Sequence, residues 1–178
     1  MFINLSDVLS EHHKPIDEVV SVEMTEFQSA LGSMPIIEKG PAHIVVKHVK
    51  QKELTIEGDC RLVLEIPCDR CLEPVATSFQ LDFTKDVDLN DQDDQNDEPI
   101  DELDEKNYID GYNLDVDKLL YNEMLIGWPM KILCSEDCKG ICNTCGQNLN
   151  KGTCNCEDTS LDPRMSVIRD VFKNFKEV

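Results

Sequence analysis

Alternating apolar and polar positions predict strands in the first half of the chain. From Leu54 to Ile66 the even positions are apolar, glycine or cysteine and the odd ones are mostly polar, and Val75 to Phe83 repeats the alternation. A period of two is that of a strand with one buried face. Ala42 to Val49 is a third, β-branched run, and Val19 to Phe27 is a weaker fourth. Because the connections are short, we expect an antiparallel sheet with one face on a core.

The hydrophobic period becomes helical towards the C-terminus. A first helix is predicted to begin after an N-cap at Asp115 and to end before Pro129, and a second begins at Asp162 and Pro163. The apolar stripes are Val116, Leu119, Leu120, Met124 and Trp128 for the first helix, and Met165, Ile168, Phe172 and Phe175 for the second. We expect both stripes to be packing faces, because short helices are stabilised mainly by burying one side.

These patterns predict an α+β protein. We expect an N-terminal antiparallel β-sheet, partly closed as a barrel or sandwich-like, followed by two helices joined by a cysteine-rich zinc-binding segment. The predicted regions are a β-domain over residues 1–88, an acidic disordered linker over 89–106 and a helical C-terminal region over 107–178. The linker is predicted from charge: Asp86 to Glu105 hold 11 acids and no base, in a chain of net charge −19.

A dense cysteine cluster predicts a metal site. Six of the nine cysteines fall within 23 residues, and all six are candidate ligands: Cys134, Cys138, Cys142, Cys145, Cys154 and Cys156. Four thiolates bind Zn²⁺ tetrahedrally, so we expect one structural zinc ion. Cys142 and Cys145 are expected members because Gly146 completes a tight knuckle. Their partners are left open between the Cys134 and Cys138 pair and the Cys154 and Cys156 pair. Nine cysteines do not suit a complete disulfide framework.

A second cysteine motif, Cys68-x-x-Cys71, falls in the turn between two predicted strands. It is interpreted as a structural or partner-contacting turn, as half of a shared metal site, or as a redox pair. Cys68, Arg70 and Cys71 are the candidate partner-binding residues. Cys60, by contrast, lies on the apolar face of its strand and is expected to be a buried structural thiol.

The sequence predicts a non-enzymatic protein of the cytoplasm. The first residues lack a basic stretch and a long apolar core, no segment approaches the ~20 apolar residues of a membrane span, and reduced thiols suit a reducing compartment. Catalytic motifs such as H-E-x-x-H and G-x-S-x-G are absent, and we expect no catalytic residues. The four histidines, which are expected to be surface or strand residues, are His12, His13, His43 and His48.

The two cysteine motifs and their order resemble those of the YceD-like family. The residues that carry the resemblance are CDRCLEP on the hairpin, the acidic gap, then CSEDCKGICNTCGQNLN, a CNC pair and a closing DPRM. The chain keeps Cys68, Arg70, Cys71 and Pro74 of the first motif. In the second it keeps all the thiols, with Asn143 where proline is usual, a change that affects turn rigidity and not ligation. The resemblance implies a bacterial cytosolic or plastid protein needed for synthesis, processing or stability of 23S ribosomal RNA, with no established catalytic activity.

The charge bears on how such a role is performed. A protein that binds RNA through its phosphates needs a basic surface. This chain has 36 acidic and 17 basic residues and no basic cluster. We therefore expect it to act on 23S RNA indirectly, through a basic ribosomal or ribosome-assembly protein. A direct RNA-binding zinc protein and a redox or zinc-sensing protein are the alternatives. The sequence gives no oligomeric state.

Overall fold

Two compact units make up the chain. The computed structural model describes residues 1–10, 13–29, 32–50, 53–89 and 108–156. Unit 1 consists of Met1–Ile66 and Ala76–Met130, and unit 2 of Pro67–Val75 and Lys131–Val178. The predicted linker, apart from residue 89, and the predicted second helix lie outside the described residues. The unit boundaries fall at different positions from the predicted regions, because the turn that carries Cys68 and Cys71 belongs with the C-terminal cysteines.

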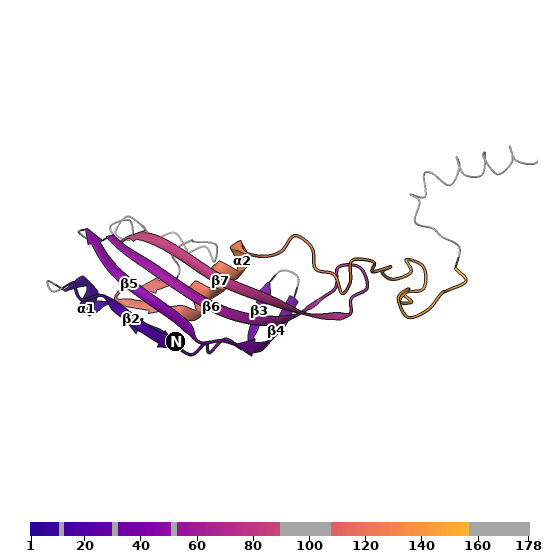
Figure 1. The fold of residues 1–178 in the computed structure, drawn as a ribbon, viewed down its shortest axis with the longest axis horizontal. Coiled ribbons are helices and arrows are strands. Elements are labelled where there is room, and N and C mark those ends of the chain that lie inside the picture. Colours follow the sequence, from indigo (N-terminus) through magenta and orange to yellow (C-terminus); the bar gives the residue numbers. More distant parts are fainter. Residues whose placement is uncertain (11–12, 30–31, 51–52, 90–107, 157–178) are drawn as a thin grey trace, which may run out of the picture. The chain divides into compact units, whose positions relative to one another are not determined.

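The large sheet is built from six strands in the order β2-β5-β6-β4-β3, with β7 also paired to β6 (Figure 1). The pairs β2–β5, β5–β6, β4–β6 and β3–β4 are all antiparallel. The strands are β2 (Ile16–Val20), β3 (Glu26–Ser29), β4 (Gly32–Lys39), β5 (Ala42–Lys50), β6 (Glu53–Pro67) and β7 (Pro74–Asp88). The three longest strands, β5, β6 and β7, are the three clearest runs of the sequence, so these three predicted strands are confirmed.

The central strand β6 shows why alternation was a reliable signal. Its even positions from Leu54 to Ile66 are all buried, whereas most odd positions are exposed or partly exposed. Cys60 is 2% exposed, as predicted, and burial raises the pKa of its thiol to about 11. This thiol therefore stays protonated at neutral pH and serves as a small apolar side chain.

A shorter three-stranded sheet has the order β1-β9-β8. Its strands are β1 (Phe2–Asn4), β8 (Ile109–Asp110) and β9 (Asn113–Asp115), and the helices are α1 (Ser6–Leu9) and α2 (Val116–Ile126). Strand β1 pairs with β9, so the beginning of the chain is joined to the stretch just before α2.

Helix α2 confirms the predicted first helix. The side chain of Asp115 accepts a hydrogen bond from Lys118 N at 3.3 Å and caps it. The buried residues are Val116, Leu119, Leu120 and Met124, four of the five predicted stripe positions. The helix ends at Ile126, before the predicted stop at Pro129, because Gly127 forms its C-cap. Beyond the cap, Trp128 stacks on Phe27 with ring centroids 5.0 Å apart.

The predicted α+β class is wrong. Strands dominate the described residues, and both helices there, α1 and α2, precede the cysteine segment instead of flanking it. The predicted partly closed barrel is wrong as well, because the described strands form open antiparallel sheets. The periodicity of α2 identified a helix with one buried face but not what covers that face.

The predicted strand from Val19 to Phe27 is also wrong, because two strands lie there. β2 ends at Val20 and β3 begins at Glu26. Between them the backbone N–H groups of Glu23 and Met24 donate to Asp117 Oδ1 at 3.0 and 3.1 Å. A carboxylate on α2 thus replaces a neighbouring strand as the hydrogen-bond acceptor. Such a long-range bond cannot be predicted from alternation along the sequence.

Gly58 on β6 provides a test of core packing. A Cβ atom at this position would lie 2.5 Å from Phe83 Cζ and 2.9 Å from Ile44 Cδ1. We predict that Gly58→Ala lowers the free energy of unfolding by about 1–3 kcal/mol through overpacking. Denaturant unfolding measures the effect, and Phe83→Leu added to Gly58→Ala should restore part of it. A Gly58→Ala protein as stable as the parent would contradict this packing.

His43 predicts a pH dependence. Its Nε2 lies 2.8 Å from Asp17 Oδ1 and its Nδ1 lies 3.2 Å from Asp59 Oδ1, so only the doubly protonated ring can donate to both. The hydrogen bond to Asp17, then that to Asp59, raises the pKa of His43. The stabilisation is therefore complete below the unfolded pKa of about 6.5 and is lost as pH rises through the higher folded pKa.

The measurement compares the thermal midpoints of the parent and His43→Gln across pH. The parent's advantage should be largest in mildly acidic buffer and should shrink as pH rises. An advantage that grows with pH would mean that the ring is neutral in the folded protein.

Candidate metal centres

The turn between β6 and β7 brings two cysteines to its tip. Cys68 N donates to Glu73 O at 2.8 Å, and Leu72 N donates to Cys68 O at 2.9 Å. The second bond closes a tight turn around Cys68-x-x-Cys71, so that both thiols can face one centre. This turn belongs to unit 2.

Hydrogen bonds join this turn to the segment that carries the next two cysteines. Asp69 N donates to Ile132 O at 2.9 Å, and Ile132 N donates to Asp69 Oδ2 at 2.6 Å. The Arg70 guanidinium donates to Cys138 O at 2.7 Å, and Arg70 O accepts from Ile141 N at 3.1 Å. Residues more than sixty positions apart in sequence are thereby held side by side.

The first cysteine group consists of Cys68, Cys71, Cys134 and Cys138, whose sulfurs all lie within 4.8 Å of one another. Cys68 Sγ lies 3.8 Å from Cys138 Sγ, and Cys71 Sγ lies 3.5 Å from Cys134 Sγ. Four sulfurs placed tetrahedrally at ~2.3 Å from an ion such as Zn²⁺ are ~3.8 Å apart. The spacing therefore fits a four-thiolate metal centre.

Donors around the first group favour charged sulfur. Burial by itself would raise the pKa of Cys68, but backbone N–H groups, including Cys134 N at 3.4 Å, together lower it to about 6. Asn150 Nδ2 donates to Cys138 Sγ at 3.2 Å and is the main cause of that thiol's lowered pKa. The side chain of Asn150 is fixed in turn by Lys139 N, which donates to its Oδ1 at 2.8 Å.

Cys71 shows the opposite shift. The backbone N–H of Glu73 would lower its pKa, but burial and the neighbouring thiols, Cys134 foremost, raise it to about 12. Thiolates crowded together resist ionisation of the next thiol, and a bound dication removes that resistance. Binding of a metal to this group would therefore release protons.

The second cysteine group consists of Cys142, Cys145, Cys154 and Cys156, again with sulfurs within 4.8 Å of one another. Gly146 N donates to Cys142 O at 2.9 Å, and Cys142 N donates to Gln147 O at 2.8 Å. The backbone N–H groups of Cys145 and Thr144 lower the pKa of Cys142 to about 6. The Cys145 thiol raises the pKa of Cys156 to about 12. This chemistry matches that of the first group.

The two Cys-x-x-Cys turns are close copies with one difference. In each, the residue after the second cysteine donates its N–H to the first cysteine's carbonyl at 2.9 Å. That residue is Gly146 in the second turn, with φ of 74°, and Leu72 in the first, with φ of 61°. A leucine in the left-handed region is strained by about 1 kcal/mol or more. The Leu72 side chain is nevertheless 64% exposed.

All six cysteines predicted as ligands fall into the two groups. Of the two partner sets left open for Cys142 and Cys145, the structure brings together the one with Cys154 and Cys156. The sequence predicted one metal ion, and it named Cys68 and Cys71 as partner-binding candidates with half of a shared metal site as an open alternative. The signal that could have found them is arithmetic: two Cys-x-x-Cys motifs and two further pairs make two sets of four.

The histidines described by the structure belong to unit 1 and lie outside both cysteine groups. The rings of His13 and His48 stack with centroids 3.8 Å apart, and His43 lies between two aspartates. Their predicted role as surface or strand residues is confirmed for these three, and His12 lies outside the described residues.

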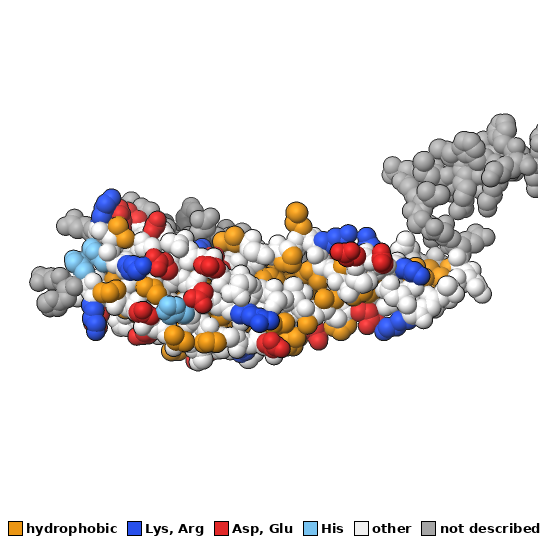
Figure 2. Space-filling model, viewed as in Figure 1, with side chains coloured by type: hydrophobic (Ala, Val, Ile, Leu, Met, Phe, Trp, Pro, Cys, Tyr) orange, Lys and Arg blue, Asp and Glu red, His pale blue; other side chains and the backbone are white. Residues whose placement is uncertain are grey.

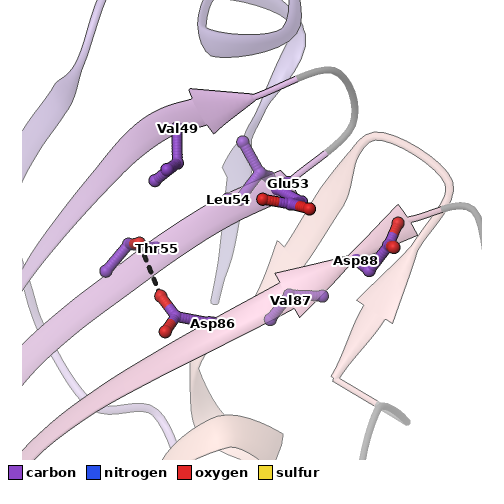
Figure 3. Close-up of a pocket in the computed structure, with 7 residues that line it drawn as sticks. All are labelled: Val49, Glu53, Leu54, Thr55, Asp86, Val87 and Asp88. Carbon is purple, nitrogen blue, oxygen red and sulfur yellow. Dashed lines mark hydrogen bonds between the residues drawn. The ribbon is translucent and has the colours of Figure 1, made fainter.

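Unit 1 also has a hollow of about 310 Å³ at the ends of β5, β6 and β7 (Figure 3). Glu53, Asp86 and Asp88 line it, and Thr55 Oγ1 donates to Asp86 Oδ1 at 2.6 Å. The remaining lining residues are Val49, Leu54 and Val87. The lining thus offers three carboxylates, the Thr55 hydroxyl and aliphatic groups.

No helix in the described part of the chain is long and apolar enough to cross a membrane.

Comparisons with known proteins identify the family. The family model described as "Large ribosomal RNA subunit accumulation protein YceD" matches residues 56–172. Similar curated proteins are the chloroplastic "Large ribosomal RNA subunit accumulation protein YCED homolog 1" of Zea mays and of Arabidopsis thaliana. The maize protein is 27% identical over 149 residues, which cover 70% of this chain and 50% of the relative. The Arabidopsis protein is 29% identical over 130 residues, which cover 60% and 40%.

The chain thus spans half or less of the length of the curated relatives it matches. No solved structure matches it significantly. The family match includes β6 from Ile56 onwards, β7, α2 and both cysteine groups. Because that match extends over more than half of its residues, the chain belongs to the YceD family of large ribosomal RNA subunit accumulation proteins.

Proposed function

We propose that this protein supports the accumulation of large-subunit ribosomal RNA by holding a basic ribosomal or ribosome-assembly protein, with two structural zinc ions folding unit 2. The role in RNA accumulation rests on family membership and on the names of the relatives. The observation that carries the protein-holding mechanism is the unequal division of charge between the two units.

Unit 1 holds nearly all of the acid excess. Its sequence contains 27 acidic and 9 basic residues, whereas that of unit 2 contains 9 and 8. On the face shown in Figure 2, the described carboxylates are spread among Lys and Arg side chains instead of forming one block. The acid excess of unit 1 would steer a cationic partner over a distance and repel the phosphates of free RNA.

The metal chemistry supports zinc in a structural role. Each group offers four sulfur ligands, which complete a tetrahedral coordination shell and leave no position for substrate or water. When bound, Zn²⁺ would neutralise the thiolates and hold the chain segments together. The chain's own residues do the rest: backbone N–H groups and Asn150 donate to the sulfurs and orient them. We therefore propose a non-enzymatic protein of a reducing compartment such as the cytoplasm.

The tip of the β6–β7 turn is the proposed contact for the partner. Cys68 and Cys71, two of the predicted partner-binding residues, are 0% and 5% exposed and belong to the first cysteine group. Arg70 is exposed, although its guanidinium already donates to Cys138 O. Leu72 adds an exposed apolar side chain held at a strained backbone position, and strain of this kind is typical of functional sites.

Direct RNA binding is the second candidate function, and one observation favours it. Because unit 2 is nearly balanced in charge, the acidity of the whole chain does not argue against an RNA contact there. The basic residues described in unit 2 are Arg70, Lys131, Lys139 and Lys151, all exposed. Lys151 Nζ forms an ion pair with Glu73 Oε1 at 2.6 Å, so its charge is partly neutralised before it could meet a phosphate.

Zinc content tests the metal part of the proposal. Protein purified without chelator should carry two zinc ions per chain, one for each cysteine group. Cys71→Ser and Cys145→Ser should each remove one ion, because each leaves a group with three thiolates. Cys60→Ala is the matched control, since Cys60 belongs to neither group and should leave both ions in place. Parent protein with clearly fewer than two zinc ions per chain would count against the proposal.

Binding at two ionic strengths tests the partner. Basic large-subunit proteins should bind the loaded protein with an association rate that falls several-fold between ~50 and ~200 mM salt, whereas purified 23S RNA fragments should bind weakly at both. Tight binding to RNA with none to any basic protein would establish the second candidate instead.

Leu72→Gly tests the contact site. Because glycine is at home at positive φ, the variant should keep its zinc and its fold while its affinity for the basic partner falls about tenfold or more. Ile126→Ala is the control, because Ile126 at the end of α2 is also an apolar residue with an exposed side chain, 73% exposed. Equal losses of affinity for the two variants would show that the turn is not part of the interface.

A further inference from the structure

We infer that the two cysteine groups hold their metal with different permanence: the Cys68 group is a closed structural centre, and the Cys142 group is an exchangeable site that can be emptied while the rest of unit 2 stays folded. The inference rests on the proposed zinc occupancy of both groups. It makes residues 142–156 a metal-responsive element.

The first difference between the two cysteine groups is the burial of their sulfur ligands. In the Cys68 group, Cys68, Cys71 and Cys138 are 0%, 5% and 3% exposed, and only Cys134 reaches the surface. In the Cys142 group none of the four is buried: Cys145 is exposed and the other three are half-buried. A competing ligand must reach the ion or a coordinating sulfur, and solvent reaches all four sulfur ligands of the Cys142 group but only Cys134 of the Cys68 group.

The two cysteine groups also differ in the hydrogen bonds that surround them. The Cys68 group is enclosed by bonds that do not involve the metal: Asp69 with Ile132, Arg70 with Cys138 and with Ile141. Releasing its ion requires these two chain segments to part. Local openings that break many bonds are rare, because each adds to the free energy of opening.

The two cysteine pairs of the Cys142 group flank an anchored stretch, residues 148–151. Asn148 Nδ2 and Lys151 Nζ both donate to Glu73 Oε1, at 3.1 and 2.6 Å, and Asn150 reaches Cys138. Residues 148–151 are thus attached to the β6–β7 turn and to the first group, whatever the state of the second. Loss of the second ion need only loosen the Cys142–Cys145 knuckle and the short stretch after Lys151.

The stretch with Cys154 and Cys156 is tied to the knuckle by a side chain. Gln147 Nε2 donates to Thr153 O at 3.2 Å, and both ends of this bond are exposed. All four ligands of the group come from 15 consecutive residues. Such a loop can release one cysteine ligand at a time. A chelator can then bind the metal while the remaining cysteines still hold it, and remove it in steps. The ion that suits this site is a thiophilic d¹⁰ dication, Zn²⁺ or Cd²⁺.

The test is stepwise removal of zinc from the full chain. Protein first shown to hold two zinc ions is mixed with excess chromogenic chelator, and thiol alkylation followed by peptide mass mapping is sampled over time. One ion should leave at least about tenfold faster than the other, because local opening of the exposed loop costs less free energy. During the fast phase, label should appear on Cys142, Cys145, Cys154 and Cys156 and spare the Cys68 group.

Variants assign the phases. Cys145→Ser and Cys156→Ser should each abolish the fast phase and keep the slow one, and Cys60→Ala should keep both. Release of both ions in one phase, or first labelling of Cys68, Cys71 or Cys138, would overturn the inference. Fewer than two zinc ions at the start would instead refute the proposed occupancy, so the two failures are distinguishable.

Discussion

The meeting of four sulfurs at the tip of the β6–β7 turn is the constraint on which unit 2 depends. Cys68 and Cys71 come from one end of a long hairpin, and Cys134 and Cys138 come from a segment more than sixty residues later. Among the described residues, the apolar side chains that pack against the buried cysteines are those of Val75, Leu133 and Ile141. A core this small supplies little hydrophobic stabilisation, so the coordination bonds of a metal would contribute most of the free energy that holds the segments together.

Charge and metal chemistry are divided between the units. Unit 1 supplies the sheet, the core and the acid excess, and the described cysteine groups both belong to unit 2. The long strands β6 and β7 cross the boundary in sequence, and the turn between them belongs to unit 2. The proposed steering surface and the proposed partner contact are thus separate parts of one chain, which fits the fast, salt-sensitive and specific association that we propose.

Local patterns predicted what local physics determines. The alternation along β6, the N-cap at Asp115 and the buried stripe of α2 are all set by neighbours within a turn or a strand, and the structure has them where the sequence placed them. Long-range contacts were not predictable. Asp117 interrupts the expected strand before Phe27, and the pairing of β1 with β9 puts strands in a region expected to be helical.

The cysteine groups show the same division. Spacing identified Cys142 and Cys145 as one knuckle, because the ring closed by Gly146 is local. The partnership of Cys71 with Cys134 is set by contacts around Asp69 and Arg70, which no spacing rule encodes. The β4 strand was missed for a related reason: Pro35 and the irregular pattern around it obscure a strand that is secured by pairing with β3 and β6.

The most direct test of this account is to locate the metal itself. Crystals of the zinc-loaded full chain, measured on both sides of the zinc absorption edge, give an anomalous difference map in which only zinc contributes strongly. The account predicts two separate peaks, one among the sulfurs of Cys68, Cys71, Cys134 and Cys138 and the other within the Cys142 group. A single peak shared by the later cysteines, with Cys68 and Cys71 outside its coordination sphere, would contradict it.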